Sequence, residues 1–479
     1  MILRSFLPRL LCTCFAGFTV GCGGGGPSIS DLAQGTPAAP TSPSGSAGSS
    51  SGSGSGSTGS SSPVSTFCGG NGTAANPYLI CTEAQFRQIG TYPSASFRLT
   101  QNISLTQPVA PIPNFSGDIN GYGFRVSNLQ CVTSGTVRAS WIQTMTGLIS
   151  DITFQGAMIS GGGDRTGLIA VNQGVIYLVS VLSSNIYGSS SSVIGFIGGI
   201  VAENLAVMED VTFTGSVNYG TNSVVGGVVG VNRSGAELKW AMLGESGQVQ
   251  RMGGGGNYFT GGVVGINYGN LRKSAVVSTA SVAGGANTGG VAGANAAGGL
   301  IEGAIMAGSV RANVVGTSLG GVVGYNQGSL RLAGAGTTAS INGELTAEAT
   351  LGGVAGYNTP EGVIEDSYSL ATFSGAGANA AAGGLIGYQS GTARRNYTYG
   401  SLASFTYLGS FCGYRNANTL TSDSYFSSSH GPMTDSCAAG RTASQLQSQS
   451  TYVGWDFTTK WTLSTSYTPV HRWPFTYPN

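Results

Sequence analysis

Small apolar residues recur along most of this chain in a short pattern that ends in a polar amide. The stretch "GGVVGYN" at 320–326 is typical, because glycines precede and follow an aliphatic pair and asparagine closes the run. Between copies, runs such as "EDVTFTGSVNYG" at 209–220 place apolar residues at alternate positions. Alternation of period two, bounded by Gly, Asn and Ser, predicts short β-strands separated by turns.

The pattern repeats about every 30 residues. The glycine before each aliphatic pair occupies positions Gly167, Gly199, Gly227, Gly262, Gly290, Gly321, Gly353 and Gly384, with a degenerate copy at Ser410. Five residues later, an asparagine stands at Asn172, Asn204, Asn232, Asn267, Asn295, Asn326 and Asn358. A fixed period in this range is typical of a stacked array. We therefore predict an all-β fold, a parallel β-helix of roughly 30-residue coils with short capping helices at its ends.

Structural roles account for the glycines and the asparagines. Glycine permits positive φ in the turns, and the aliphatic pair stacks on its counterparts in neighbouring coils. Asparagine can turn the chain at a strand end and hydrogen-bond to identical amides above and below it. We interpret the seven asparagines as a structural ladder and not as a binding site.

The first residues predict export and membrane attachment. Arg4 and Arg9 precede a short apolar run at 10–20, which is typical of a signal peptide. The run ends in "TVGC", which resembles a bacterial lipobox and implies that Cys22 is lipidated, although Thr19 departs from the usual leucine. Ordinary secretion with cleavage elsewhere is the alternative.

Composition then divides the chain. Residues 1–21 form the predicted lipoprotein signal peptide, and residues 22–63, rich in Gly, Ser and Pro, form a flexible tether. We place an N-terminal cap and the first coils at 64–165, the repeat β-helix at 166–415 and a C-terminal cap at 416–479. Within the first cap, Thr82 and Gln85 match a capping box that begins a short helix.

At this point the chain resembles a known family. Copies such as "GGVVGVN", "GGVVGINYG" and "GGVAGYN" are similar to the GLUG motif of adhesin-like bacterial surface proteins, over roughly residues 167–413. The resemblance implies a surface role. We expect a lipid-anchored protein of the outer membrane or cell surface with adhesin-like display or binding and without catalysis, for which a host glycan or matrix protein is a candidate partner.

The balance of charges and the small number of histidines exclude several kinds of functional site. With 20 Lys and Arg against 19 Asp and Glu, no net field attracts nucleic acid, so we expect no nucleic-acid partner. The two histidines exclude a HExxH site and a histidine-rich metal centre, and no lysine follows a glycine to form a phosphate loop. We expect no metal and no cofactor. The "GTSLG" around Ser318 matches a nucleophile elbow, but a repeat strand follows it where a helix is needed.

A polysaccharide lyase or glycosidase on the same scaffold is the alternative function. The best acidic pairs, Glu209 with Asp210 and Glu365 with Asp366, stand at equivalent repeat positions about five coils apart. That is about 25 Å along the axis, because strands stack about 4.8 Å apart, and it is too far for one glycosidase site. We interpret each pair as a solvated turn and predict no catalytic residues.

Cysteines and tyrosines give the remaining candidates. We pair Cys68 with Cys81 and Cys412 with Cys437, because each pair lies at one end of the array, and this leaves Cys131 as a buried free thiol. Tyrosines follow the aliphatic pair in several coils, at Tyr268, Tyr325, Tyr357, Tyr388 and Tyr414. They predict either an exposed stripe for ligand contact or semi-buried packing.

Overall fold

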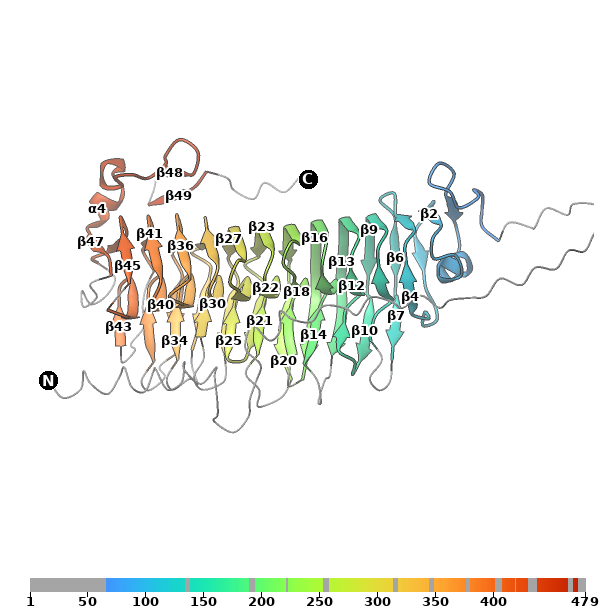
Figure 1. The fold of residues 1–479 in the computed structure, drawn as a ribbon, viewed down its shortest axis with the longest axis horizontal. Helices are drawn as coiled ribbons and strands as arrows, with labels where there is room; N and C mark the ends of the chain where they lie inside the picture. The colour runs from blue at the N-terminus through green and yellow to red at the C-terminus, as the bar shows by residue number, and fades with distance from the viewer. Residues whose placement is uncertain are drawn as a thin grey trace, which may run out of the picture.

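The fold is a parallel β-solenoid, here taken from a computed structural model. The structure describes residues 66–133, 138–188, 194–220, 223–252, 258–312, 318–343, 349–375, 380–400, 407–417, 419–429, 437–463 and 468–472. Figure 1 shows the coils stacked side by side into one rod, with chain order following the rod from blue to red. The predicted fold class is therefore confirmed.

Three parallel sheets run along the rod. Over most of the rod, each coil contributes strands to all three sheets. Strands that, apart from the first, end in glycine form the glycine sheet: β11 (Arg165–Thr166), β14 (Gly195–Gly198), β17 (Ser223–Gly226), β21 (Phe259–Gly261), β25 (Asn287–Gly289), β29 (Ser318–Gly320), β34 (Thr350–Gly352), β39 (Ala381–Gly383) and β43 (Tyr407–Gly409). Strands that mostly end in the asparagines form the asparagine sheet: β4 (Ile112–Phe115), β8 (Ile142–Met145), β12 (Ile169–Asn172), β15 (Val201–Asn204), β18 (Val229–Asn232), β22 (Val264–Asn267), β26 (Ala292–Asn295), β30 (Val323–Asn326), β35 (Ala355–Asn358), β40 (Ile386–Gln389) and β44 (Cys412–Arg415).

The third sheet, called the wide sheet below, contains the longest strands. Its first strands are β1 (Tyr78–Ile80), β2 (Ser96–Leu99), β3 (Ile103–Ser104), β5 (Asp118–Asn120), β6 (Arg125–Ser127), β7 (Gln130–Val132), β9 (Leu148–Gln155), β10 (Met158–Gly161), β13 (Val175–Gly188), β16 (Val207–Tyr219), β19 (Glu237–Leu243) and β20 (Gln248–Arg251). Its later strands are β23 (Asn270–Val276), β24 (Ser281–Gly284), β27 (Leu300–Met306), β28 (Ser309–Ala312), β31 (Ser329–Arg331), β32 (Gly334–Ala335), β33 (Ser340–Asn342), β36 (Val363–Glu365), β37 (Tyr368–Ser369), β38 (Thr372–Ser374), β41 (Thr392–Arg394), β42 (Tyr397–Thr398), β45 (Leu420–Ser422), β46 (Tyr425–Ser427) and β47 (Ala439–Arg441).

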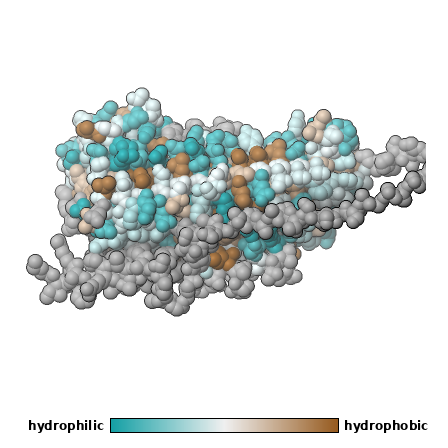
Figure 2. Space-filling view, viewed as in Figure 1, coloured by the Kyte–Doolittle hydropathy of each residue, from teal (hydrophilic) through white to brown (hydrophobic). Residues whose placement is uncertain are grey.

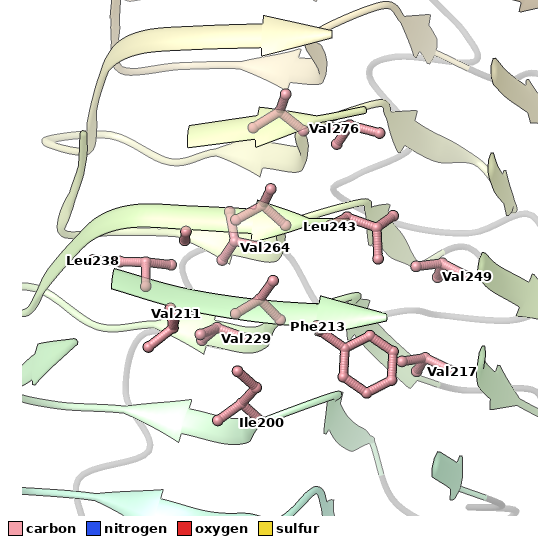
Figure 3. Packing of buried hydrophobic residues seen from close by; sticks show 14 of the residues in the cluster. Ile200, Val211, Phe213, Val217, Val229, Leu238, Leu243, Val249, Val264 and Val276 are labelled. Atoms are coloured by element: carbon pink, nitrogen blue, oxygen red, sulfur yellow. The ribbon is translucent and has the colours of Figure 1, made fainter. Parts of the chain in front are cut away.

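Apolar side chains of equivalent positions stack inside the rod. Val211 pairs in register with Ala241, and Phe213 with Leu243 in the next coil, and all four are buried. Figure 3 shows Val211, Phe213 and Leu243 among the apolar side chains that fill the space between the sheets. Each layer needs the layers beside it to exclude water, so the core is continuous along the array.

Two glycine positions allow the glycine sheet and the asparagine sheet to pack closely. A Cβ atom on Gly226 would lie 1.9 Å from the carbonyl oxygen of Val229, across the turn between β17 and β18. A Cβ atom on Gly265 would lie 2.7 Å from Cγ1 of Val224. These distances are far below van der Waals contact, so the first and last glycines of the repeat are required for close approach of backbones.

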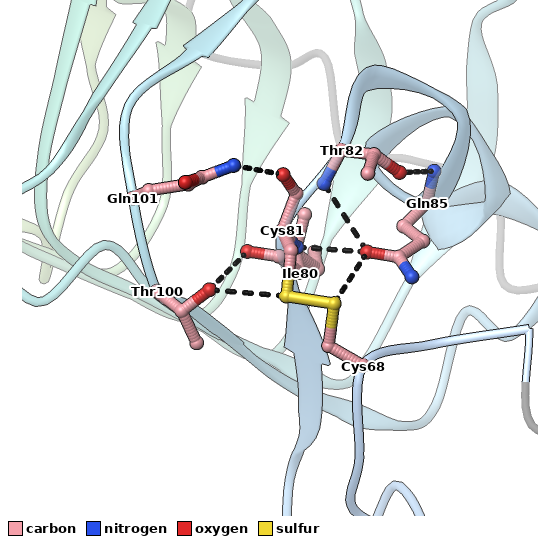
Figure 4. Close-up of a disulfide and its surroundings, with 7 residues drawn as sticks. All are labelled: Cys68, Ile80, Cys81, Thr82, Gln85, Thr100 and Gln101. Carbon is pink, nitrogen blue, oxygen red and sulfur yellow. Dashed lines mark hydrogen bonds between the residues drawn. A yellow bond between two sulfur atoms is a disulfide. The ribbon is translucent and has the colours of Figure 1, made fainter.

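Short capping elements and disulfides stand at both ends. The predicted capping box is confirmed, because Gln85 N donates to Thr82 Oγ1 at 3.3 Å. Thr82 caps the helix α3 (Glu83–Arg87), and η2 (Gln88–Thr91) follows it. Figure 4 shows the disulfide of Cys68 and Cys81 beside this helix.

The C-terminal cap contains α4 (Ala443–Leu446), η3 (Gln449–Thr451) and the antiparallel pair β48 (Trp461–Leu463) and β49 (Pro469–His471). The second predicted disulfide, between Cys412 and Cys437, joins this cap to the last coils. Cys131 is a buried free thiol, as expected.

A candidate ligand-binding groove

From the coil of β9 onward, each coil bends within the wide sheet at an equivalent residue of positive φ, and these residues form a column along the rod. The bend column consists of Asp151, Leu178, Asp210, Trp240, Lys273, Gly303, Leu332, Asp366, Arg395 and Asp423. All of these residues have positive φ, between 48° and 54° for those other than glycine. The left-handed conformation costs a residue with a side chain roughly 1–2 kcal/mol, so the backbone of the bend column is strained at every residue other than glycine.

A second column lies two residues beyond the bend, and its side chains point outward beside the bend. The floor column consists of Thr153, Ser180, Thr212, Met242, Ala275, Ile305, Gly334, Tyr368, Tyr397 and Tyr425. Short hydroxyl side chains occupy the first coils, and tyrosines occupy the last. The small residues leave the first coils hollow.

The hollow is an open groove of about 370 Å³ over β9, β13, β16, β19 and β23. Asp151 and Asp210 stand along its bend side, Thr153, Ser180 and Thr212 form its floor, and Trp240 with Met242 forms its end. Figure 2 shows apolar surface on the side of the rod where β13 and β16 are labelled in Figure 1. The groove therefore combines carboxylates, hydroxyls, an indole and apolar surface.

Polar groups in the groove have few partners of their own. Within the described chain, the hydroxyls of Thr153, Ser180 and Thr212 make no hydrogen bond, and neither Asp151 nor Asp210 makes an ion pair. Burial raises the pKa of Asp210, and repulsion from Glu209 adds to that effect, while attraction from Lys239 opposes it. At the end of the groove, Lys273 Nζ lies 4.5 Å from the centre of the Trp240 ring. The carboxylates and floor hydroxyls of the groove are therefore available to a ligand, whereas Lys273 and Trp240 contact each other.

By contrast, the charged column on the other side of the bend is paired from coil to coil. It consists of Glu209, Lys239, Arg272, Glu302, Arg331, Glu365 and Arg394 in register. Lys239 bonds to Glu209, Arg272 to Glu302 at 2.9 Å, and Arg394 to Glu365. The partly exposed pairs, Lys239 with Glu209 and Arg272 with Glu302, stabilise by roughly 0.2–1 kcal/mol each.

The prediction of solvated turns is wrong for the second acidic pair. Glu365 and Asp366 are buried, and Asp366 binds Arg395 Nε at 2.7 Å and Lys460 Nζ at 2.6 Å. Burial opposes the ionisation of Asp366, but the hydrogen bonds from Arg395 and Lys460 outweigh it and lower the pKa. The predicted separation of five coils between Glu209 and Glu365 is confirmed by the register.

The C-terminal cap covers the same two columns at the other end of the rod. Tyr368, Tyr397 and Tyr425 of the floor column pack against Trp455 and Trp461 of the cap. On the bend column, His471 Nε2 donates to the carbonyl oxygen of Asp366 at 2.8 Å, and Trp455 Nε1 donates to that of Asp423 at 3.0 Å. Figure 1 shows this red segment folding back over the strands β41 and β36. The groove is therefore the uncovered part of a longer channel.

The sequence-predicted asparagines form a continuous buried ladder. Each Nδ2 donates to the amide oxygen of the next coil at 2.7–3.0 Å, through Asn172, Asn204, Asn232, Asn267, Asn295, Asn326 and Asn358 to Gln389. All of these side chains are fully buried. They cannot contact a ligand.

The other predicted residues also serve packing. Tyr325, Tyr357, Tyr388 and Tyr414 pack ring against ring with centres 5.0–5.3 Å apart, edge to face in the first two contacts. Tyr268 is out of register and belongs to a buried cluster against which Tyr325 also packs. Ser318 is buried in the glycine sheet and lies 3.4 Å from the hydroxyl of Thr350 in the next coil. The lipobox and Cys22 lie outside the described residues.

Two features are absent from the described ranges. No group of three or more His, Cys, Asp and Glu side chains is placed to hold a metal ion. No helix among the described residues is long and apolar enough to cross a membrane.

The sequence interpretation missed the groove because no residue type marks the bend. Asp151, Leu178, Asp210 and Trp240 share a column but no common residue type. Asp210 was paired with Glu209, its neighbour in sequence, and Asp151 was not singled out. A positional signal was present, since each bend residue follows the ladder position by six or eight residues, as Asp210 follows Asn204 and Trp240 follows Asn232. Counting from the asparagines would have assembled the column.

Comparison with known proteins gives limited matches. No protein-family model matches the chain. Over 156 residues the chain is 28% identical to halomucin of Haloquadratum walsbyi, a match that covers 28% of this chain and 2% of halomucin, so the chain spans only a small fraction of that relative's length.

Two solved structures are similar at low scores. A "putative immunoglobulin A1 protease" from Bacteroides ovatus is 18% identical and has a TM-score of 0.32, with 85% of this chain and 96% of that chain covered. A structure named IgA1 protease is 10% identical and has a TM-score of 0.28, with 78% and 24% covered. At these scores, the fold assignment rests on the strand register of the chain itself.

Proposed function

We propose that the chain is a GLUG-motif surface lipoprotein, held in the outer membrane by a lipid on Cys22, whose solenoid binds an external partner without catalysis. The observation that carries the binding role is the open groove, where carboxylates and hydroxyls stand without partners while the neighbouring charged column is paired. Unpartnered polar groups in a hollow with apolar walls are the usual make-up of a binding site.

A binding screen tests this role. Purified full-length protein, kept in detergent, is tested against immobilised glycans and matrix proteins, which are the partner classes that suit an adhesin-like surface. Saturable binding that leaves the partner intact supports the proposal. If the protein binds no glycan and no matrix protein, the proposed binding function is contradicted.

Lipidation is tested separately by Cys22→Ser, with Cys14→Ser in the leader as the matched control. Cells fed a palmitate label incorporate it into the wild-type protein and the control, and the protein fractionates with outer membranes. Cys22→Ser loses the label and leaves an unprocessed or soluble form. Retention of the label in Cys22→Ser contradicts the lipobox interpretation.

A glycosidase on this scaffold is the second candidate, and one observation favours it. Asp151 and Asp210 line the same groove two coils apart, which is about 10 Å at the spacing of stacked strands. That lies near the upper limit for two carboxyls of an inverting glycosidase, and a raised pKa suits a general acid. Release of new reducing ends from a bound glycan favours this candidate over pure binding.

A further inference from the structure

The bend and floor columns give the same channel two different linings. In the last coils, Tyr368, Tyr397 and Tyr425 fill it, and the cap seals it with Trp455 and Trp461. In the first coils, the same floor positions are Thr153, Ser180 and Thr212. The chain therefore closes one end of the channel with aromatic rings and leaves the other end polar and open.

The open half suits a ligand rich in hydroxyl groups. The Asp151 and Asp210 carboxylates accept hydrogen bonds, and the three floor hydroxyls can donate or accept them. Trp240 adds an apolar wall for the C–H face of a ring. Sugars present this combination of hydroxyl edges and apolar ring faces.

Charge argues against an anionic ligand. Within the described ranges, Asp151 and Asp210 bring two carboxylates without an ion pair to the bend side of the groove, whereas the charges of Glu209 and Lys239 offset each other and Lys273 lies over Trp240. A polyanion such as nucleic acid or a polyuronate would be repelled by unpaired carboxylates. Among carbohydrate ligands, these carboxylates favour a neutral chain over an anionic one.

Geometry sets the direction of the ligand. Equivalent groups recur once per coil, about every 4.8 Å along the rod, which is close to the advance of an extended sugar chain per residue. Thr153, Ser180 and Thr212 belong to three successive coils, and Asp151 and Asp210 are two coils apart. A chain lying parallel to the axis meets a floor hydroxyl in each of these coils and a bend carboxylate in the first and third of them.

From these observations we infer that the open groove binds a neutral polysaccharide lying along the solenoid axis. The inference rests on the proposed binding function and deepens it by naming the site and the class of ligand. Asp151 and Asp210 bind the sugar hydroxyls, the floor hydroxyls position them, and Trp240 packs on a ring at the end of the groove.

The experiment measures binding of cellohexaose, mannohexaose, xylohexaose and chitohexaose to the full-length protein by titration calorimetry, with hexagalacturonate as the anionic comparison. We expect at least one neutral hexasaccharide to bind, and hexagalacturonate to bind at least tenfold more weakly. Trp240→Ala, Asp151→Asn and Asp210→Asn each weaken binding tenfold or more. Asp423→Asn is the matched control, since it has the same backbone conformation outside the groove, and it stays within twofold of the wild type.

The possible outcomes distinguish failure of the polysaccharide inference from failure of the proposed binding function. If a hexasaccharide binds and the three groove variants match the wild type, the groove assignment is overturned while the binding function stands. If no neutral hexasaccharide binds, the ligand class is overturned, and a matrix protein bound in the screen then identifies a protein occupant. Circular dichroism confirms that each variant is folded, because a substitution at a bend can unfold a coil.

Discussion

Replacing Asn326 by leucine removes one rung from the middle of the asparagine ladder. Asn326 Nδ2 donates to Asn358 Oδ1 at 2.8 Å and lies 3.4 Å from the carbonyl oxygen of Val363, and Asn326 Oδ1 accepts from Asn295 Nδ2 at 3.0 Å. The side chain is fully buried, so water cannot replace these bonds. Leucine is close in size but can neither donate nor accept.

The magnitude follows from the groups left without a partner. Asn295 Nδ2 keeps the carbonyl oxygens of Gly299 and Ser329, whereas Asn358 Oδ1 loses the donor that Asn326 provided. An unsatisfied buried acceptor costs roughly 1–3 kcal/mol. We therefore expect the free energy of unfolding to fall by about 1–3 kcal/mol.

Urea denaturation followed by circular dichroism measures the change, with Asn114→Leu as the control. Asn114 lies in the same sheet, on β4, but is exposed. The midpoint should fall for Asn326→Leu and stay unchanged for Asn114→Leu. An unchanged midpoint for Asn326→Leu would refute the argument that the ladder stabilises the rod.

Two further predictions use buried titratable groups. Burial lowers the pKa of His471 to about 4 from about 6.5 in the unfolded chain, so below pH 6.5 the unfolded state binds a proton that the folded state excludes. The free energy of unfolding should fall by up to about 3 kcal/mol from pH 6.5 to 4. Thermal melts at each pH should show a weaker pH dependence for His471→Gln than for the wild type, and the same pH dependence in both proteins would contradict the prediction. Burial raises the pKa of Cys131 to about 11, so iodoacetamide at pH 8 should label this thiol only in urea, and rapid labelling of the folded protein would contradict its burial.

The sequence predicted those features that repeat in register. The period placed Asn172 to Asn358 on one column, because identical amides can satisfy one another only when they stack. Position at the two ends of the array was sufficient to pair Cys68 with Cys81 and Cys412 with Cys437. The expectation that the repeat glycines take positive φ in the turns is wrong, because none of those that precede the aliphatic pairs has a positive φ. They are needed because neighbouring backbone lies too close for a Cβ atom.

Features that depend on distant segments could not be read from the repeat. Asp366 looked like a solvated turn residue because Lys460, its partner, lies 94 positions away in a cap that shares no pattern with the coils. The groove was missed because bulky residues such as Trp240 occupy a left-handed position for which sequence reasoning expects glycine. Cross-coil neighbours, and not sequence neighbours, define both sites.

Excision of one whole coil tests most directly the claim that the chain is a modular rod with a localised binding groove. Deleting residues 321–352 joins Gly320 to Gly353, and Gly320 pairs in register with Gly352, so the deletion removes one coil beyond the groove and leaves equivalent positions joined. Because each coil contacts only its neighbours, we predict a folded, shorter rod that binds its glycan with unchanged affinity. Collapse of the fold, or loss of binding with the fold intact, would contradict the account.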